Sequence, residues 1–98
     1  MAEYRITRWR DIPSLVTARG ADGAAVKVPL PDRFQEAIDE LAMRTGAAGS
    51  DAYLEGWVQD DWQTRDGEPG AVAATVAEEL EQTYPPAQLD ALVAGREG

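Results

Sequence analysis

The chain has 98 residues, the size of one small domain, and its 44 % hydrophobic content is typical of a globular protein. It contains no cysteine and no histidine, which excludes disulfides, thiolate nucleophiles, and the commonest general base and zinc ligand. The chain has no apolar signal-peptide run and no stretch near the roughly 20 apolar residues of a membrane helix, so we expect a cytoplasmic protein.

The net charge of −9 is unevenly distributed along the chain. Residues 1–30 hold five cations and three acids, a net charge of +2, whereas residues 31–98 hold four cations and fifteen acids, a net charge of −11. The acidic part repels phosphates, so we expect neither nucleic acid nor an anionic membrane as partner. Eight of the nine cations are arginines, which bind carboxylates in a bidentate manner and stack on aromatic rings. We therefore expect the N-terminal part to hold acidic side chains of this chain or of a partner.

The first predicted strand is residues 3–10, "EYRITRWR". Its side chains alternate, with Ile6 on one face and Trp9 on the other, and its β-branched and aromatic content favours a strand. We expect the following "DIP" to end this strand. Ile12 is forced into an extended conformation before Pro13, and Pro13 cannot donate to a ladder.

Two further strands are predicted at residues 14–19 and 24–28. The segment between them, "GADG" at residues 20–23, contains two glycines that can take the positive φ angles of a tight turn. The three strands together predict an antiparallel meander.

The clearest helix is predicted at residues 31–46, because Pro31 suits a first helical turn and Gly46 a helix end. One stripe of this helix is apolar. It contains Phe34, Ala37, Ile38, Leu41 and Ala42.

A second helix is predicted from an N-cap at Ser50 to about residue 66, with Tyr53 and Trp57 sharing a face. Gly56 would then lie in the middle of a helix, where glycine costs about 1 kcal/mol relative to alanine. We expect it to allow close packing with a neighbour.

Two C-terminal helices are predicted, one at residues 71–83 and a short one starting at Pro86, before a polar end that should fray. We therefore predict one α+β domain over residues 1–98, in which three to four helices pack on one face of the three-stranded antiparallel meander. Its parts would be the meander (3–30), a helical hairpin (31–66) and the C-terminal helices (67–98).

Three sequence motifs, "WRDIP", "LPDRFQEAIDELAMRTG" and "SDAYLEGW", together resemble the small bacterial family known as "virulence factor". The resemblance covers about residues 4–62, and the tail from about Gly67 lies outside it. It implies a small domain that stands alone or is attached to a scaffold domain of the iron–sulfur assembly type. It also implies a setting near folate and corrinoid one-carbon enzymes, and it brings no set of catalytic residues.

The first candidate site is the cluster Arg8, Trp9, Arg10 and Asp11. In a structural interpretation, Trp9 packs against a helix and Asp11 accepts hydrogen bonds at the end of the strand. In a functional interpretation, the cluster presents a patch to an acidic or aromatic partner surface, because Trp and Arg are enriched at binding hot spots. Trp62 lies among acidic and polar neighbours and is expected to be exposed, as contact residues are.

The acidic groups at residues 60–61 and 78–81 are either a solvated face or oxygen ligands for Mg²⁺ or Ca²⁺, but they lack the spacing of a calcium loop. A carboxylate pair for glycoside hydrolysis would need a cleft that short loops do not provide. No hydroxyl has an activating partner in a sequence motif, and no glycine motif for phosphate is present. We therefore predict that the chain is not an enzyme and holds no metal or cofactor.

The pattern favours a non-catalytic protein–protein interaction or accessory module of a cytoplasmic bacterial metabolic or cofactor-handling system. It would bind a protein partner, or itself, through the sheet face that bears Arg5, Trp9 and Arg19, together with Trp62. The predicted partner-binding residues are Arg5, Arg8, Trp9, Arg10, Asp11 and Trp62. The alternative is a small-molecule-binding accessory protein for a folate- or corrinoid-like ligand. The predicted ligand-stacking residues are Trp9, Tyr53 and Trp57.

Overall fold

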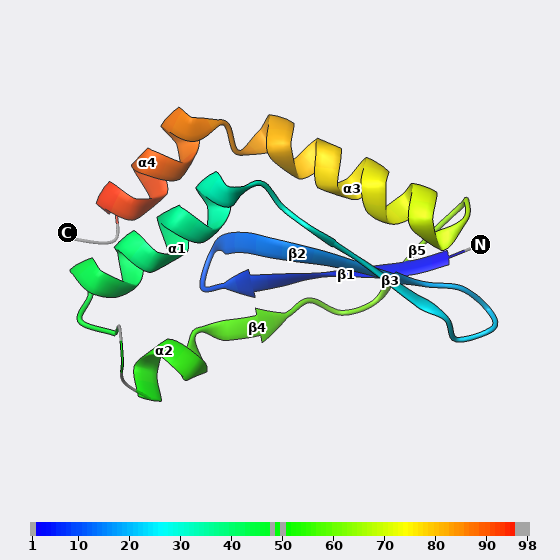
Figure 1. Ribbon diagram of the computed structural model, residues 1–98, viewed down its shortest axis with the longest axis horizontal. Helices are drawn as coiled ribbons and strands as arrows, with labels where there is room; N and C mark the ends of the chain where they lie inside the picture. The colour runs from blue at the N-terminus through cyan, green and yellow to red at the C-terminus, as the bar shows by residue number, and fades with distance from the viewer. Residues whose placement is uncertain (1, 48, 50, 96–98) are drawn as a thin grey trace.

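The protein, seen in a computed structural model that describes residues 2–47, 49 and 51–95, is built on an antiparallel sheet with helices packed against it (Figure 1). In the described residues the sheet has five strands in the order β3-β2-β1-β4, with β5 also paired to β1. The strands are β1 (Ala2–Trp9), β2 (Ile12–Arg19), β3 (Ala25–Pro29), β4 (Trp57–Gln59) and β5 (Gln63–Arg65). The helices are α1 (Asp32–Arg44), α2 (Asp51–Glu55), α3 (Pro69–Thr83) and α4 (Pro86–Gly95). The predicted α+β class is confirmed, but the sheet extends beyond the predicted three strands.

The core lies between one face of the sheet and the helices. Helix α3 runs along β1, β2 and β3, and α4 continues beyond it and lies beside α1, as Figure 1 shows. Ile6 and Val16, which face each other across β1 and β2, are buried in the same core as Ile38 of α1 and Val76 of α3. Side chains of a strand alternate between its two faces. The strand residues between these buried positions therefore lie on the opposite face, which we call the outer face. It comprises Glu3, Arg5, Thr7, Leu15, Thr17, Arg19, Ala25, Lys27 and Pro29.

The turn between β1 and β2 lies earlier than predicted. Arg10 and Asp11 form it, with Arg10 at a φ angle of 54°, whereas Ile12 and Pro13 lie within β2. The prediction that "DIP" ends the strand is therefore wrong. The register of β1 and β2 shifts between the pairs Thr7–Leu15 and Arg8–Pro13. Pro13 is tolerated in β2 because it lies at this irregularity, where the ladder is interrupted.

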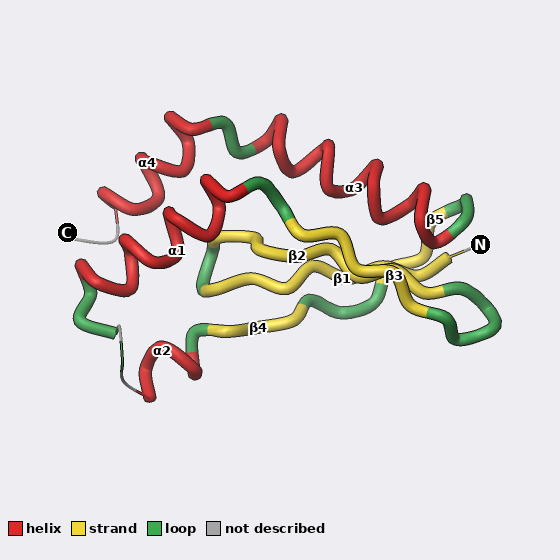
Figure 2. Tube along the Cα trace, viewed as in Figure 1, coloured by secondary structure: helices red, strands yellow, loops and turns green. Residues whose placement is uncertain are grey.

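The predicted second helix, and with it the helical hairpin over residues 31–66, is wrong. Helix α2 ends at Glu55, and the chain then pairs with the second edge of β1 as β4 and β5. That edge of β1 would otherwise expose unpaired N–H and C=O groups. Figure 2 shows β4 and β5 as short yellow segments separated by a connection. The predicted N-cap, Ser50, lies outside the described residues.

Strands β4 and β5 behave as one edge strand interrupted by a bulge. Gln59 pairs with Thr7, and Gln63 pairs with Tyr4, so four steps along this edge oppose three steps along β1. One extra residue is therefore accommodated between them, and the amide of Asp60 continues the ladder by donating to the Ile6 carbonyl over 3.0 Å. Alternation back from Gln63 places Trp62 on the outer face.

The other helices agree with prediction. All five predicted apolar residues of α1 are buried, and α3 begins at Pro69, two residues before its predicted start. Helix α4 buries Leu89 and Val93. The end predicted to fray, residues 96–98, lies outside the described residues. No helix in the described part of the chain combines the length and apolarity needed to cross a membrane.

Candidate functional site

The most distinctive feature of the outer face is a tryptophan ring held by two arginines. The Cζ atom of Arg5 lies 4.5 Å from the centroid of the Trp62 ring, and that of Arg19 lies 3.8 Å from it. Arg5 pairs with Thr17 and Arg19 with Glu3, so the two arginines are diagonal neighbours on adjacent strands. The bulge brings Trp62 to the same place, although Trp62 is distant from both arginines in the sequence. Cation–π contacts contribute about 0.5 to 2 kcal/mol each, depending on exposure.

The outer face also carries unbalanced positive charge. It holds three cations, Arg5, Arg19 and Lys27, and its strand residues include one acid, Glu3, which gives this face a net charge of +2. Arg19 is neutralised in part, because its Nε donates to Glu3 Oε1 over 3.1 Å. Within the described part of the chain, neither Arg5 nor Lys27 forms an ion pair. A chain of net charge −9 therefore has one face whose cations have spare capacity for an acceptor.

The centre of this face is closely packed. Thr17, between Arg5 and Lys27 in the sheet, is only 7 % exposed although no helix was expected to cover it. Its neighbours Arg5 and Thr7 have a buried Nε and a buried Oγ1 that find no hydrogen-bond partner among the described residues. The stems of the long side chains and the Trp62 ring thus form a defined surface and do not extend freely into water.

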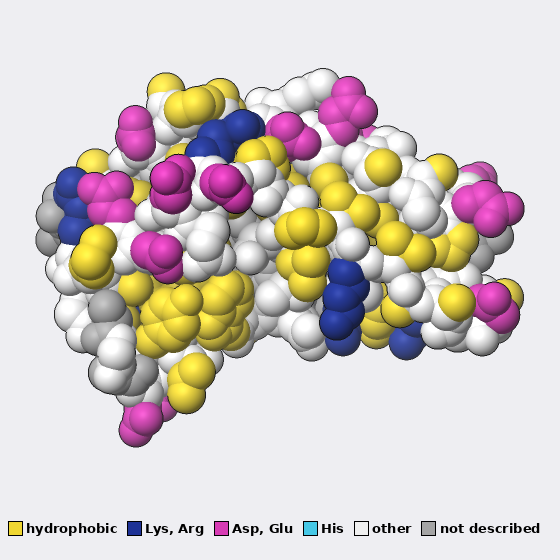
Figure 3. Space-filling model, viewed as in Figure 1, with side chains coloured by type: hydrophobic (Ala, Val, Ile, Leu, Met, Phe, Trp, Pro, Cys, Tyr) yellow, Lys and Arg dark blue, Asp and Glu magenta, His cyan; other side chains and the backbone are white. Residues whose placement is uncertain are grey.

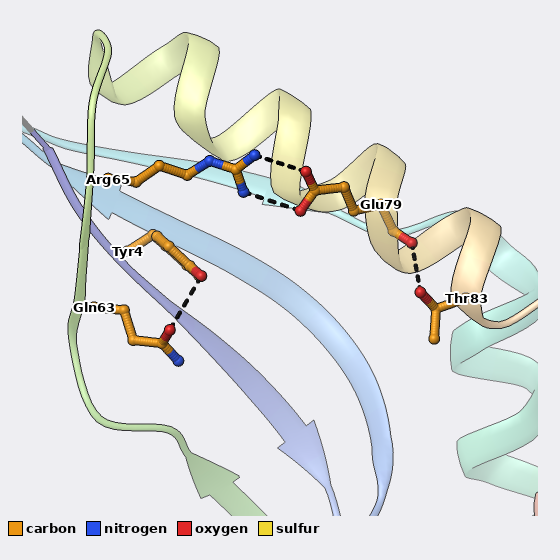
Figure 4. A network of polar contacts seen from close by, with 5 residues as sticks. All are labelled: Tyr4, Gln63, Arg65, Glu79 and Thr83. Atoms are coloured by element: carbon orange, nitrogen blue, oxygen red, sulfur yellow. Dashed lines mark hydrogen bonds and ion pairs between the residues drawn. The ribbon is translucent and has the colours of Figure 1, made fainter.

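The edge that carries Trp62 is anchored to α3 by the polar network in Figure 4. Arg65 donates to both carboxylate oxygens of Glu79, with Nη1–Oε1 and Nη2–Oε2 distances of 2.9 and 2.7 Å. These hydrogen bonds lower the pKa of the Glu79 carboxyl below its ordinary value and raise that of the Arg65 guanidinium. The Tyr4 hydroxyl donates to Gln63 Oε1 over 3.2 Å. The first and last residues of β5 are therefore tied down, which fixes the position of the adjacent Trp62.

Trp9 belongs to the core and not to a surface patch. Its side chain is 0 % exposed, and its indole Nε1 donates to the carbonyl of Tyr53 over 2.7 Å. The backbone of Gly56 lies so close to the ring that an added Cβ would be 2.5 Å from Nε1. The expectation that Trp9 contacts a partner is therefore corrected, because α2 and Gly56 close over it.

The remaining residues of the first candidate cluster point to different places. Arg8 lies on the other side of the strand from Arg5 and forms an ion pair with Asp60, with an Nε–Oδ2 distance of 3.0 Å. The Arg10 guanidinium lies 4.6 Å from the centroid of the Trp9 ring, and Asp11 is exposed in the turn. Of the predicted partner-binding residues, the structure brings together Arg5 and Trp62, with Arg19 beside them as expected. It adds Lys27 to the same face.

The three residues predicted to stack on a ligand stack instead on one another. The ring centroids of Trp9 and Tyr53 are 5.6 Å apart, and those of Tyr53 and Trp57 are 6.0 Å apart in an edge-to-face arrangement. Tyr53 and Trp57 are half-buried, and Tyr53 lines an open hollow of about 400 Å³. Because Trp9 is enclosed, it has no free ring face to offer a planar ligand.

Lys27 and Glu3 were not predicted as part of the site. The alternation of side chains along the strands could have predicted Lys27, since it lies on the same face as Arg19 and the two strands that carry them pair with each other. The acidic groups considered as metal ligands do not converge either. Among the described residues, no three carboxylates come together in a way that could hold a metal ion.

The fold and the site geometry thus define the protein as a small α+β domain that carries an arginine–tryptophan cluster on one face of its sheet. The chain belongs to the family described as "Virulence factor", whose model matches residues 7–93. The match confirms the resemblance drawn from the motifs and extends it through α3 and α4, beyond the Gly67 limit of that resemblance. Searches of curated proteins and of solved structures gave no significant match.

Proposed function

We propose that this domain is a non-catalytic interaction module whose outer face binds an acidic segment of a partner protein. The observation that carries the proposal is the contact of Arg5 and Arg19 with the Trp62 ring, 4.5 and 3.8 Å from its centroid. Arginine and tryptophan are the side chains most enriched at hot spots, and here the sheet, the bulge and the Glu3 contact hold them before any partner arrives.

The charge of the chain favours carboxylates over nucleic acid as the ligand. A long polyanion such as DNA experiences the electrostatic field of the whole protein, and a protein with a net charge of −9 repels it. A short acidic segment meets only the local field of the outer face, where Arg5 and Lys27 have no ion pair among the described residues. Arginine binds carboxylates with two parallel hydrogen bonds, which adds geometric selectivity. We place this module in a cytoplasmic metabolic or cofactor-handling system, as the family resemblance suggests.

The test compares capture of partners by the tagged wild-type chain and by an Arg5→Gln/Trp62→Ala variant from the cytoplasm of the source organism. The proposal predicts a partner that the wild type retains in stoichiometric amount and that the variant loses. The peptide of this partner that is protected on binding should be rich in Asp and Glu. A partner retained equally by both chains would contradict the proposal.

Two further variants keep this test decisive. Arg44→Gln removes one positive charge from exposed α1, away from the outer face, and should leave capture unchanged. Lys27→Glu reverses a charge on the exposed strand β3 without disturbing the packing of Trp62, and it should reduce capture. If the double variant does not fold, as judged by circular dichroism, Lys27→Glu alone decides.

A further inference from the structure

A second surface, at the opposite end of the sheet from β5, exposes apolar side chains. Met43 of α1 and Leu54 of α2 are 66 % and 69 % exposed, respectively. Met43 and Tyr53 line the same open hollow of about 400 Å³, and Tyr53 contacts the Trp57 ring. Figure 3 shows hydrophobic side chains gathered between the α1 and α2 regions. Exposed apolar patches of this kind mark binding surfaces more often than single exposed residues do.

The rim of this apolar surface is acidic. Asp39 lines the hollow, and Asp51 and Glu55 flank the exposed side chains of α2. Within the described residues none of the three forms an ion pair. Figure 3 shows acidic side chains beside the hydrophobic ones, over α1 and α4. A ligand that fits this surface would combine apolar side chains with cations.

The elements of this surface also indicate the backbone that its ligand would have. Met43 and Tyr53 project from α1 and α2, and the residues that line the hollow belong to these two helices and to the connection between them. The hollow itself therefore offers an extended peptide no strand edge to pair with. A ligand helix satisfies its own backbone and brings one apolar stripe, and methionine adapts well to such stripes. We propose that the surface formed by Met43, Tyr53, Leu54 and Trp57 docks a basic amphipathic helix of a partner protein. This site is separate from the outer face, so the domain would join two partners.

The test uses a defined probe, a 14-residue amphipathic helix of leucine and lysine, and a scrambled peptide of the same composition. Binding is measured by titration calorimetry at physiological salt. The amphipathic peptide is expected to bind about tenfold or more tightly than the scrambled one, because only it presents a continuous apolar stripe. The variant Met43→Gln/Leu54→Gln should lose that advantage. Both positions are exposed, so the variant is expected to fold.

Two controls separate this site from the alternatives. Val26→Gln changes an exposed valine of β3 that lies outside the proposed surface, and Arg5→Gln/Trp62→Ala changes the outer face; both should bind the amphipathic peptide like the wild type. Equal binding of the two peptides, or unchanged binding by Met43→Gln/Leu54→Gln, would overturn the inference. The inference would also be overturned if light scattering showed that the wild type is a dimer and that Met43→Gln/Leu54→Gln is a monomer, since a second copy of the chain would then occupy the surface.

Discussion

Replacement of Gly56 by alanine should change the free energy of unfolding in opposite directions, depending on whether Gly56 lies within a helix or packs against Trp9. If residues 51–66 formed a helix, as periodicity suggests, alanine in its middle would stabilise the protein by about 1 kcal/mol. In the structure an alanine Cβ would lie 2.5 Å from Nε1 and 2.6 Å from Cε2 of Trp9, and the ring is 0 % exposed. Either the indole or the backbone must therefore move.

The cost of that movement follows from what the indole does. Overpacking a core costs about 1 to 3 kcal/mol, and a displaced ring would also weaken the 2.7 Å hydrogen bond from Trp9 to the Tyr53 carbonyl, leaving buried groups unsatisfied at about 1 to 3 kcal/mol. Together we expect a loss of about 2 to 6 kcal/mol, which lowers the Tm of a domain of this size by about 10 to 30 °C.

Urea unfolding, followed by tryptophan fluorescence, measures the change. Gly70→Ala is the matched control, because Gly70 lies in the first turn of α3 and an added Cβ meets nothing within 4 Å. We expect this control to be neutral or to stabilise by up to about 1 kcal/mol. A Gly56→Ala protein as stable as the wild type, or more stable, would refute the close packing of Gly56 on Trp9.

Three further substitutions test the packing and the ion pairs. Trp9→Phe keeps most of the ring but removes the donor to Tyr53, so chemical denaturation should show a loss of about 1 to 3 kcal/mol; no loss would mean that the bond is unimportant. Asp60→Asn weakens a half-exposed ion pair with Arg8 and should cost at most about 1 kcal/mol, less at high salt, and a cost independent of salt would argue against it. Glu79→Gln should lower the Tm slightly at pH 7. The pKa of Glu79 is lowered in the folded protein, so its contribution is present above the ordinary carboxyl pKa and is lost as the pH falls through the folded value. The Tm difference should therefore shrink and vanish in a calorimetric series as the pH falls below the lowered pKa of Glu79. A difference constant with pH would contradict this cause.

The strands of the meander and the long helices were predictable because their signals are local. Alternation of Ile6 with its neighbours placed it on the buried face, and the apolar stripe of α1 marked its core positions. The helix predicted after Ser50 failed because two aromatic residues four apart also meet across a turn: Tyr53 and Trp57 make their edge-to-face contact on either side of Gly56.

The site depended on contacts between distant parts of the chain. Strands β4 and β5 have three residues each, too few for a period to be visible, and they form because the edge of β1 needs a partner. Trp9 is buried by a segment 44 residues away. Trp62 reaches Arg5 and Arg19 only because a bulge sets its register. The arginine and tryptophan content of the sequence indicated that such a surface exists. Which arginines and which tryptophan form it could be known only from the pairing of the strands.

The most direct test of the proposed function is photo-crosslinking from a benzoylphenylalanine placed at Ala25, an exposed and uncharged position of the outer face, and at Gln82, on the exposed side of α3. The crosslinked peptides are identified by mass spectrometry. We predict that position 25 captures an acidic segment of one partner, that position 82 does not, and that Arg5→Gln/Arg19→Gln abolishes the crosslink. Capture of the same segment from both positions, or a crosslink that survives loss of both arginines, would contradict binding through the outer face.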